Sequence, residues 1–135
     1  MIRLVVVLAA ALLPTSLGAQ AQAQAEAKDD RWVQIGEIDQ GVIYIDTQSI
    51  ERDGDRATAW YRTDLRELGR NGENEWLDRR EVDCAARTLR LLAFVEHRPD
   101  GSVAGSNPSV TAPAQSIPPG SLGEAMQQYL CHTTI

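Results

Sequence analysis

Apolar and polar side chains alternate over several short stretches of the chain, which is the pattern of half-buried β-strands. The alternation predicts strands at residues 31–38 and 42–45, joined by a hairpin turn at 39–41. It also predicts a longer strand at 57–65, whose odd-numbered residues share one face and whose even-numbered residues form a wetter one. Between these strands, residues 46–50 favour a turn or a single helical turn, in which the Asp46 side chain bonds to the backbone.

Further strands are predicted at 75–84 and 87–97, after a polar, exposed hairpin loop at 66–74. Residues 87–97 are the most apolar, so we expect a central strand covered on both faces. Strict alternation would place Leu89, Leu91, Ala93 and Val95 on one face, and Leu92 and Phe94 on the other. A short strand at 102–106 precedes a stretch rich in Pro and Ser that ends at residue 120, which we expect to run over the surface.

The pattern changes to a helical period at the end of the chain. Ser121 and Glu124 have the spacing of a capping box. The apolar residues that follow recur at helical spacing and form one face, namely Leu122, Ala125, Met126, Tyr129 and Leu130. The predicted fold is therefore α+β: an antiparallel meander of five to six strands, with a C-terminal helix packed on one face of the sheet.

The first residues have the features of a secretory signal peptide, with Arg3 followed by an apolar run and then small residues. We expect this leader to cover residues 1–21, with a cleavage site somewhere in 19–27, and a single folded domain to cover 30–135. The apolar run, residues 4–13, is shorter than the roughly 20 residues that cross a bilayer, so no membrane span is expected. The sequence thus predicts export to the periplasm or the cell surface.

The two cysteines, Cys84 and Cys131, both follow the leader. In an oxidising compartment an even number of cysteines favours a disulfide, so we predict that these two pair. Two metal-binding thiols would need further ligands at close spacing. The only histidines, His97 and His132, do not complete a zinc site, and we expect no metal and no cofactor.

Charge excludes one class of partner and suggests another. Thirteen basic against 19 acidic residues give a net charge of −6, which disfavours nucleic acid as a ligand. Arginines are nevertheless concentrated on and between the three strands predicted over 57–97, and they favour a protein contact site. The candidate contact residues are Arg62, Arg66, Arg70, Arg79 and Arg80, with the loop at 66–74. The alternative is that the arginines of this region, which include Arg87 and Arg90, pair with the interleaved Glu67, Asp78, Glu81 and Asp83.

Nothing in the spacing of the acidic residues singles out a catalytic pair. The carboxylates considered are Asp46, Asp64, Asp78, Glu81 and Asp83. A small hydrolase would need two of them in a shared cleft. We therefore expect no catalytic residues and no enzyme activity.

Through several short motifs in a fixed order, the sequence resembles the surface-adhesin protein E family of proteobacterial envelope proteins. They are Trp32, Tyr44-Ile45-Asp46 followed by Ser49-Ile50, Trp60, Asp83-Cys84 leading into Arg87-Thr88, and Ile117-Pro118-Pro119-Gly120-Ser121 before a helix that ends in Cys131. The resemblance implies an antiparallel sheet with a C-terminal helix, exposure at the cell surface, and binding to host matrix or serum proteins. The chain departs from the pattern in having no lipid-anchoring cysteine after the leader and only one lysine, Lys28.

These observations together predict a non-enzymatic binding protein of the bacterial envelope. The alternative is a periplasmic inhibitor or accessory protein that docks on an envelope enzyme. Exposed strand edges also leave open the formation of a homodimer.

Overall fold

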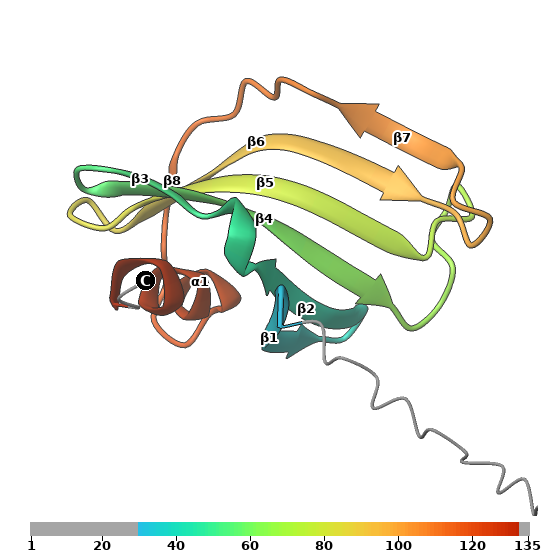
Figure 1. Cartoon of the computed structure of the whole chain (residues 1–135), viewed down its shortest axis with the longest axis horizontal. Helices are drawn as coiled ribbons and strands as arrows, with labels where there is room; N and C mark the ends of the chain where they lie inside the picture. The colour runs from blue at the N-terminus through green and yellow to red at the C-terminus, as the bar shows by residue number, and fades with distance from the viewer. Residues whose placement is uncertain (1–29, 133–135) are drawn as a thin grey trace, which may run out of the picture.

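The computed structural model describes residues 30–132, which fold into one antiparallel sheet and one α-helix (Figure 1). The signal peptide expected at the N-terminus lies outside the described residues. In chain order the elements are β1 (Trp32–Ile38), β2 (Gly41–Asp46), the short 3₁₀ helix η1 (Thr47–Ser49), β3 (Glu51–Asp53), β4 (Arg56–Leu65), β5 (Glu75–Asp83), β6 (Thr88–His97), β7 (Val103–Asn107), β8 (Gln115–Ser116) and α1 (Leu122–His132).

Six of the strands form a continuous path in the order β1-β2-β4-β5-β6-β7. The predicted meander and the α+β class are therefore confirmed. Two short strands that the sequence pattern missed lie off this path, since β3 pairs with the start of β4 and β8 pairs with the start of β6. Both are too short to show an alternation of their own.

The sheet has two unlike faces. On β4, Ala57, Ala59 and Tyr61 are buried, whereas Trp60 and Arg62 on the opposite face are partly exposed. This confirms the predicted wet and dry faces of that strand. We call the face that carries Tyr61 the inner face and the face that carries Trp60 the outer face.

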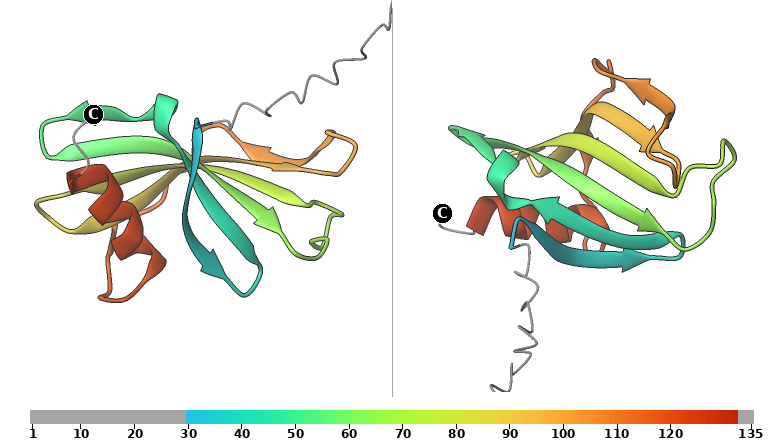
Figure 2. Two further views of the ribbon diagram at one scale, coloured as in Figure 1. Left: turned by 60° about the horizontal axis from the view of Figure 1, so that its bottom comes forward. Right: turned by 45° about the vertical axis from the view of Figure 1, so that its right-hand side comes forward.

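The helix α1 covers the inner face and packs against β1, β4 and β5 (Figure 2). Its N-terminus is capped as predicted: Ser121 Oγ accepts a hydrogen bond from the Glu124 amide at 3.3 Å, and the Glu124 carboxylate accepts one from the Gly120 amide at 2.7 Å. The main core unites strand, loop and helix residues, namely Ile43, Ile45, Ala57, Ala59, Tyr61, Val82, Ile117, Met126 and Leu130.

Two expectations about β6 were wrong. β6 carries an irregularity opposite Arg79 and Arg80, which pair with Ala93 and Leu91, so Leu92 is an extra residue. The bulge reverses the alternation, and Ala93 and Val95 therefore lie on the outer face instead of sharing the face of Leu91. Nor is β6 covered on both sides, because most of its side chains are only partly buried.

The stretch rich in Pro and Ser does not run wholly over the surface. Ile117 is 6 % exposed and belongs to the core. Its amide donates to the Arg87 carbonyl at 3.0 Å, directly after the pairing of β8 with β6. This segment therefore anchors the chain just before it enters α1.

A disulfide joins Cys84, just after β5, to Cys131 in the last turn of α1, with the two Cα atoms 5.9 Å apart. The predicted pairing is confirmed. The bond closes a loop with a sequence separation of 47, and loop-closure entropy assigns such a crosslink about 4 kcal/mol of stability. For a core of this size the crosslink is a large contribution.

We expect the double substitution Cys84→Ser and Cys131→Ser to lower the free energy of unfolding by about 4 kcal/mol, because the unfolded chain regains its loop entropy. Urea unfolding followed by tryptophan fluorescence measures the change. The double variant avoids leaving a single reactive thiol. An unchanged urea midpoint would show that other contacts alone hold α1 on the sheet.

Candidate binding surface

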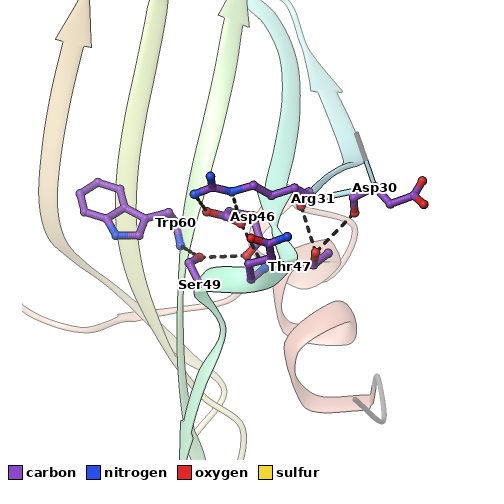
Figure 3. Close-up of polar contacts among 7 residues, drawn as sticks. Asp30, Arg31, Asp46, Thr47, Ser49 and Trp60 are labelled. Carbon is purple, nitrogen blue, oxygen red and sulfur yellow. Dashed lines mark hydrogen bonds and ion pairs between the residues drawn. The ribbon is translucent and has the colours of Figure 1, made fainter. Parts of the chain in front are cut away.

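A polar network at the end of β2 organises one edge of the outer face (Figure 3). Asp46 is 2 % exposed, and its two carboxylate oxygens accept hydrogen bonds from Arg31 Nε at 2.9 Å and Arg31 Nη2 at 2.7 Å. The Gln48 amide also donates to this carboxylate, at 3.1 Å, which closes η1 as the sequence predicted. The hydrogen bond from Arg31, followed by those of the backbone, holds the pKa of Asp46 below its usual value.

The same turn fixes the position of Trp60. Ser49 Oγ donates to the Asp46 carbonyl at 2.9 Å and accepts a hydrogen bond from the Trp60 amide at 2.8 Å. The Thr47 amide donates to the Arg31 carbonyl at 2.8 Å, which ties η1 to the start of β1. These hydrogen bonds thus fix the positions of Arg31, η1 and Trp60 relative to one another.

Beside this network the outer face is hollowed. A cavity of about 210 Å³ is lined by Arg31, Trp32, Asp46, Trp60, Leu77 and Val95, and we call it the tryptophan groove. Its residues come from five parts of the chain, which the pairing of the strands brings together. Trp32, Trp60, Leu77 and Val95 are all partly exposed, so the groove presents apolar side chains to solvent.

Two of the predicted contact residues lie on the outer face. The Arg62 guanidinium stacks on the ring of Trp32 at 4.9 Å and on that of Tyr44 at 4.8 Å, measured to the ring centroids. Arg62 also pairs with Asp64 at 2.9 Å. Arg79 sits opposite Trp60 in the pairing of β4 with β5 and forms an ion pair with Glu51 at 2.8 Å.

The other three predicted contact residues lie elsewhere. Arg66 pairs with Glu37 and donates to the carbonyls of Ile38 and Asp39, so it ties its loop to the turn between β1 and β2. Arg70 is exposed in the loop between β4 and β5. Arg80 points to the inner face, because it follows Arg79 on the same strand, and pairs with Asp78 at 2.7 Å. The five arginines therefore do not form one cluster.

The loop at 66–74 is held by a buried carboxylate that the sequence pattern missed. Glu73 is 4 % exposed, and its side chain accepts a hydrogen bond from the Asn71 amide at 2.8 Å. The Gly69 amide donates to the Glu73 carbonyl at 2.7 Å. Position 69 has no room for a side chain, because a Cβ there would overlap with the Glu73 carboxylate. Leu68, which is 63 % exposed, lies at the rim of a second cavity, of about 400 Å³.

Each of the five carboxylates considered for catalysis forms an ion pair with an arginine. The pairs are Asp46 with Arg31, Asp64 with Arg62, Asp78 with Arg80, Glu81 with Arg90, and Asp83 with Arg56. Of the interleaved pairs expected as the alternative, Glu81 pairs across strands with Arg90, and Asp78 pairs with Arg80 on the same strand, whereas the partner of Asp83 is Arg56, outside the arginines considered. Residues 30–132 contain no group of three or more His, Cys, Asp or Glu side chains placed to hold a metal ion.

Comparison with known proteins identifies the family. Residues 32–132, which include the disulfide and the whole sheet, match surface-adhesin protein E. The chain belongs to the surface-adhesin protein E family. This membership confirms the resemblance stated from the sequence and implies a protein of the cell surface. Within the described part of the chain, no helix is long and apolar enough to cross a membrane.

Solved structures of this family share the fold at low sequence identity. Crystal form II of Haemophilus influenzae protein E is 13 % identical with a TM-score of 0.61, over 76 % of this chain and 87 % of that chain. The selenomethionine form gives a TM-score of 0.59 at 13 % identity, over 76 % of this chain and 86 % of that chain. Protein E from non-typeable Haemophilus influenzae gives 0.57 at 13 % identity, over 76 % of each chain. No curated protein sequence matches the chain significantly.

We expect Asp46→Asn to lower the free energy of unfolding at neutral pH by about 1–2 kcal/mol, because Arg31 loses a charged acceptor but is partly screened by solvent. A carboxyl whose folded-state pKa is depressed stabilises the protein above its unfolded pKa, and this contribution disappears as the pH falls through the folded value. The ordinary pKa of this carboxyl is 3.8. As the pH falls below that value, the wild type should therefore lose its stability advantage over Asp46→Asn. Urea unfolding at several pH values gives the free energy of unfolding of both proteins. If the difference between them is the same at every pH, the lowered pKa of Asp46 does not contribute to stability.

A methyl group at position 69 should loosen the loop at 66–74. We expect Gly69→Ala to push the Glu73 carboxylate away from the Asn71 amide, at a cost of about 1 kcal/mol in unfolding free energy. Hydrogen exchange at the Asn71 amide should accelerate. The control is Leu68→Ala, which alters an exposed side chain in the same loop and should leave that exchange rate unchanged. Equal protection of Asn71 in both variants would show that the Glu73 carboxylate does not organise the loop.

Proposed function

We propose that this protein is a non-enzymatic adhesin of the cell surface, which binds a protein partner through the outer face of its sheet. The observation that carries the proposal is the tryptophan groove, an apolar hollow flanked by arginines on the face opposite α1. Membership of a surface-adhesin family supports the same conclusion. Partners of the class that the resemblance implies are host matrix or serum proteins, and a cleaved signal peptide would deliver the chain to the envelope.

The composition of the outer face supports a contact role. The centres of protein interfaces are enriched in aromatic residues and arginine, and a few such residues supply most of the binding free energy. Here Trp32 and Trp60 line the groove, and Arg62 is stacked on Trp32. The same face carries ion pairs such as Arg79 with Glu51 and Arg90 with Glu81. This arrangement resembles an apolar contact area within a polar rim.

Rigidity of the surface favours affinity as well. Trp60 is fixed through Ser49 and η1, and Arg62 is held between two aromatic rings and a carboxylate. Side chains that are already ordered lose less conformational entropy when a partner binds. The sheet, backed by α1 and the disulfide, thus offers a preformed contact surface.

Arg79 and Arg80 provide a matched test, because they are neighbours on β5 that point to opposite faces. The oxidised protein is measured by surface plasmon resonance against immobilised extracellular-matrix extract and serum proteins. For any protein bound, we expect Trp60→Ala to weaken binding at least about tenfold. We expect Arg79→Ala to weaken it about threefold to fivefold, as for a charge at the rim of an interface.

The Arg80→Ala variant should bind as the wild type does. Circular dichroism of each variant checks that the sheet is intact. If Arg80→Ala loses binding while Trp60→Ala and Arg79→Ala keep it, the contact surface is the inner face and the proposal is wrong. Binding only to a co-purified envelope enzyme would favour the inhibitor or accessory role instead.

A further inference from the structure

The second cavity, of about 400 Å³, lies where the turn between β1 and β2 meets the loop between β4 and β5. Residues 39–40, residues 65–69 and Trp76 line it, and we call it the loop cavity. The Arg66 amide donates to the Gln40 carbonyl at 2.8 Å, which joins the turn to the loop. The volume lies within the roughly 300–1,000 Å³ that is usual for small-molecule pockets.

The apolar part of the lining consists of Leu65, Leu68 and Trp76. Trp76 pairs with the buried Thr63, so it lies on the inner face of the sheet. None of the lining residues also lines the tryptophan groove. Aliphatic side chains next to an indole suit the hydrocarbon stem of a ligand, and the face of an indole attracts a cation.

The charged part of the lining leaves two carboxylates uncompensated. The side chains of Asp39 and Glu67 form no ion pair or hydrogen bond within residues 30–132. Arg66 is the one basic residue of the lining, and it already pairs with Glu37, whose side chain is more exposed than its own. Its guanidinium also donates to the carbonyls of Ile38 and Asp39. The lining therefore offers free acceptors, whereas its cation is occupied.

A third carboxylate lies directly behind the lining. A Cβ at Gly69, which lines the cavity, would overlap with the buried carboxylate of Glu73. The hydrogen bond from its own backbone amide is the main cause that holds the pKa of Glu73 below its usual value, and Arg98 contributes as well. Glu73 is therefore ionised at neutral pH. Arg70, which is exposed in the same loop, does not line the cavity.

We propose that the loop cavity binds a small organic cation, an alkyl ammonium or guanidinium compound whose aliphatic stem packs on the apolar lining and whose charged group contacts Asp39 and Glu67. Charge complementarity selects this ligand, because free carboxylates only accept hydrogen bonds and these cations only donate them. The net charge of the chain, −6, also favours the approach of a cation. The inference goes beyond the proposed function, since it concerns a site apart from the outer face.

The test uses pentylamine, which is a cation at neutral pH, and pentanol, which has a similar stem and no charge. Each is titrated into the oxidised, ¹⁵N-labelled protein, in which every indole gives its own signal. We expect pentylamine to shift the Trp76 indole and the Gly69 amide, and to leave Trp32 and Trp60 in place. Pentanol should bind at least about fivefold more weakly, and added salt should weaken the binding of pentylamine alone.

A double variant with Asp39→Asn and Glu67→Gln should lower the affinity for pentylamine at least about fivefold and leave that for pentanol unchanged. The matched control is Asp53→Asn with Asp55→Asn. It removes the same two charges from exposed positions outside the cavity, so it should bind pentylamine as the wild type does.

Equal binding of pentylamine and pentanol, no shift at Trp76, or an equal loss of affinity in the control variant would each overturn the inference. Tighter binding of a blocked lysine than of pentylamine would assign the cavity to a side chain of a protein partner and overturn it as well. Tighter binding of a neutral sugar would assign it to a glycan, with the same consequence. None of these outcomes involves the tryptophan groove, so the proposed function is tested separately.

Discussion

The disulfide between Cys84 and Cys131 fastens the end of α1 to the sheet, whose inner face α1 covers. A chain of this length buries only a modest core. The helix supplies Met126 and Leu130 to that core, and the capped turn at Ser121 together with Ile117 sets where it starts. With the helix fixed on one side, the other side of the sheet remains available for a partner.

The exposed side is ordered by polar contacts rather than by a second layer. Arg31, Asp46 and Ser49 form a chain of hydrogen bonds that leads to the Trp60 backbone (Figure 3). Arg62 is held by Trp32 and Tyr44. The face thus combines apolar area with guanidinium groups, two features that contribute affinity and specificity at protein interfaces in general. Family membership and the geometry of the outer face support binding as the role of the protein.

Much of the fold followed from local signals in the sequence. Alternation placed the strands, capping-box spacing placed α1, and the cysteine pair predicted the disulfide. Features that depend on long-range geometry did not follow. The bulge at Leu92 is a local insertion that has no composition signal, and it reversed the faces of the end of β6. The Arg31–Asp46 pair joins residues 15 positions apart, so no spacing rule reveals it. The separation of Arg79 and Arg80, by contrast, could have been predicted, because neighbouring residues on one strand point to opposite faces.

Binding through the outer face requires that a bound partner covers this face and leaves the inner face as it is. Hydroxyl-radical footprinting of the oxidised protein with a captured protein ligand tests this most directly, because indole rings react readily when exposed. We expect Trp32 and Trp60 to become protected on binding, and Trp76 and Tyr129 to react as in the free protein. Protection of Trp76 or Tyr129, with Trp32 and Trp60 unchanged, would contradict the account.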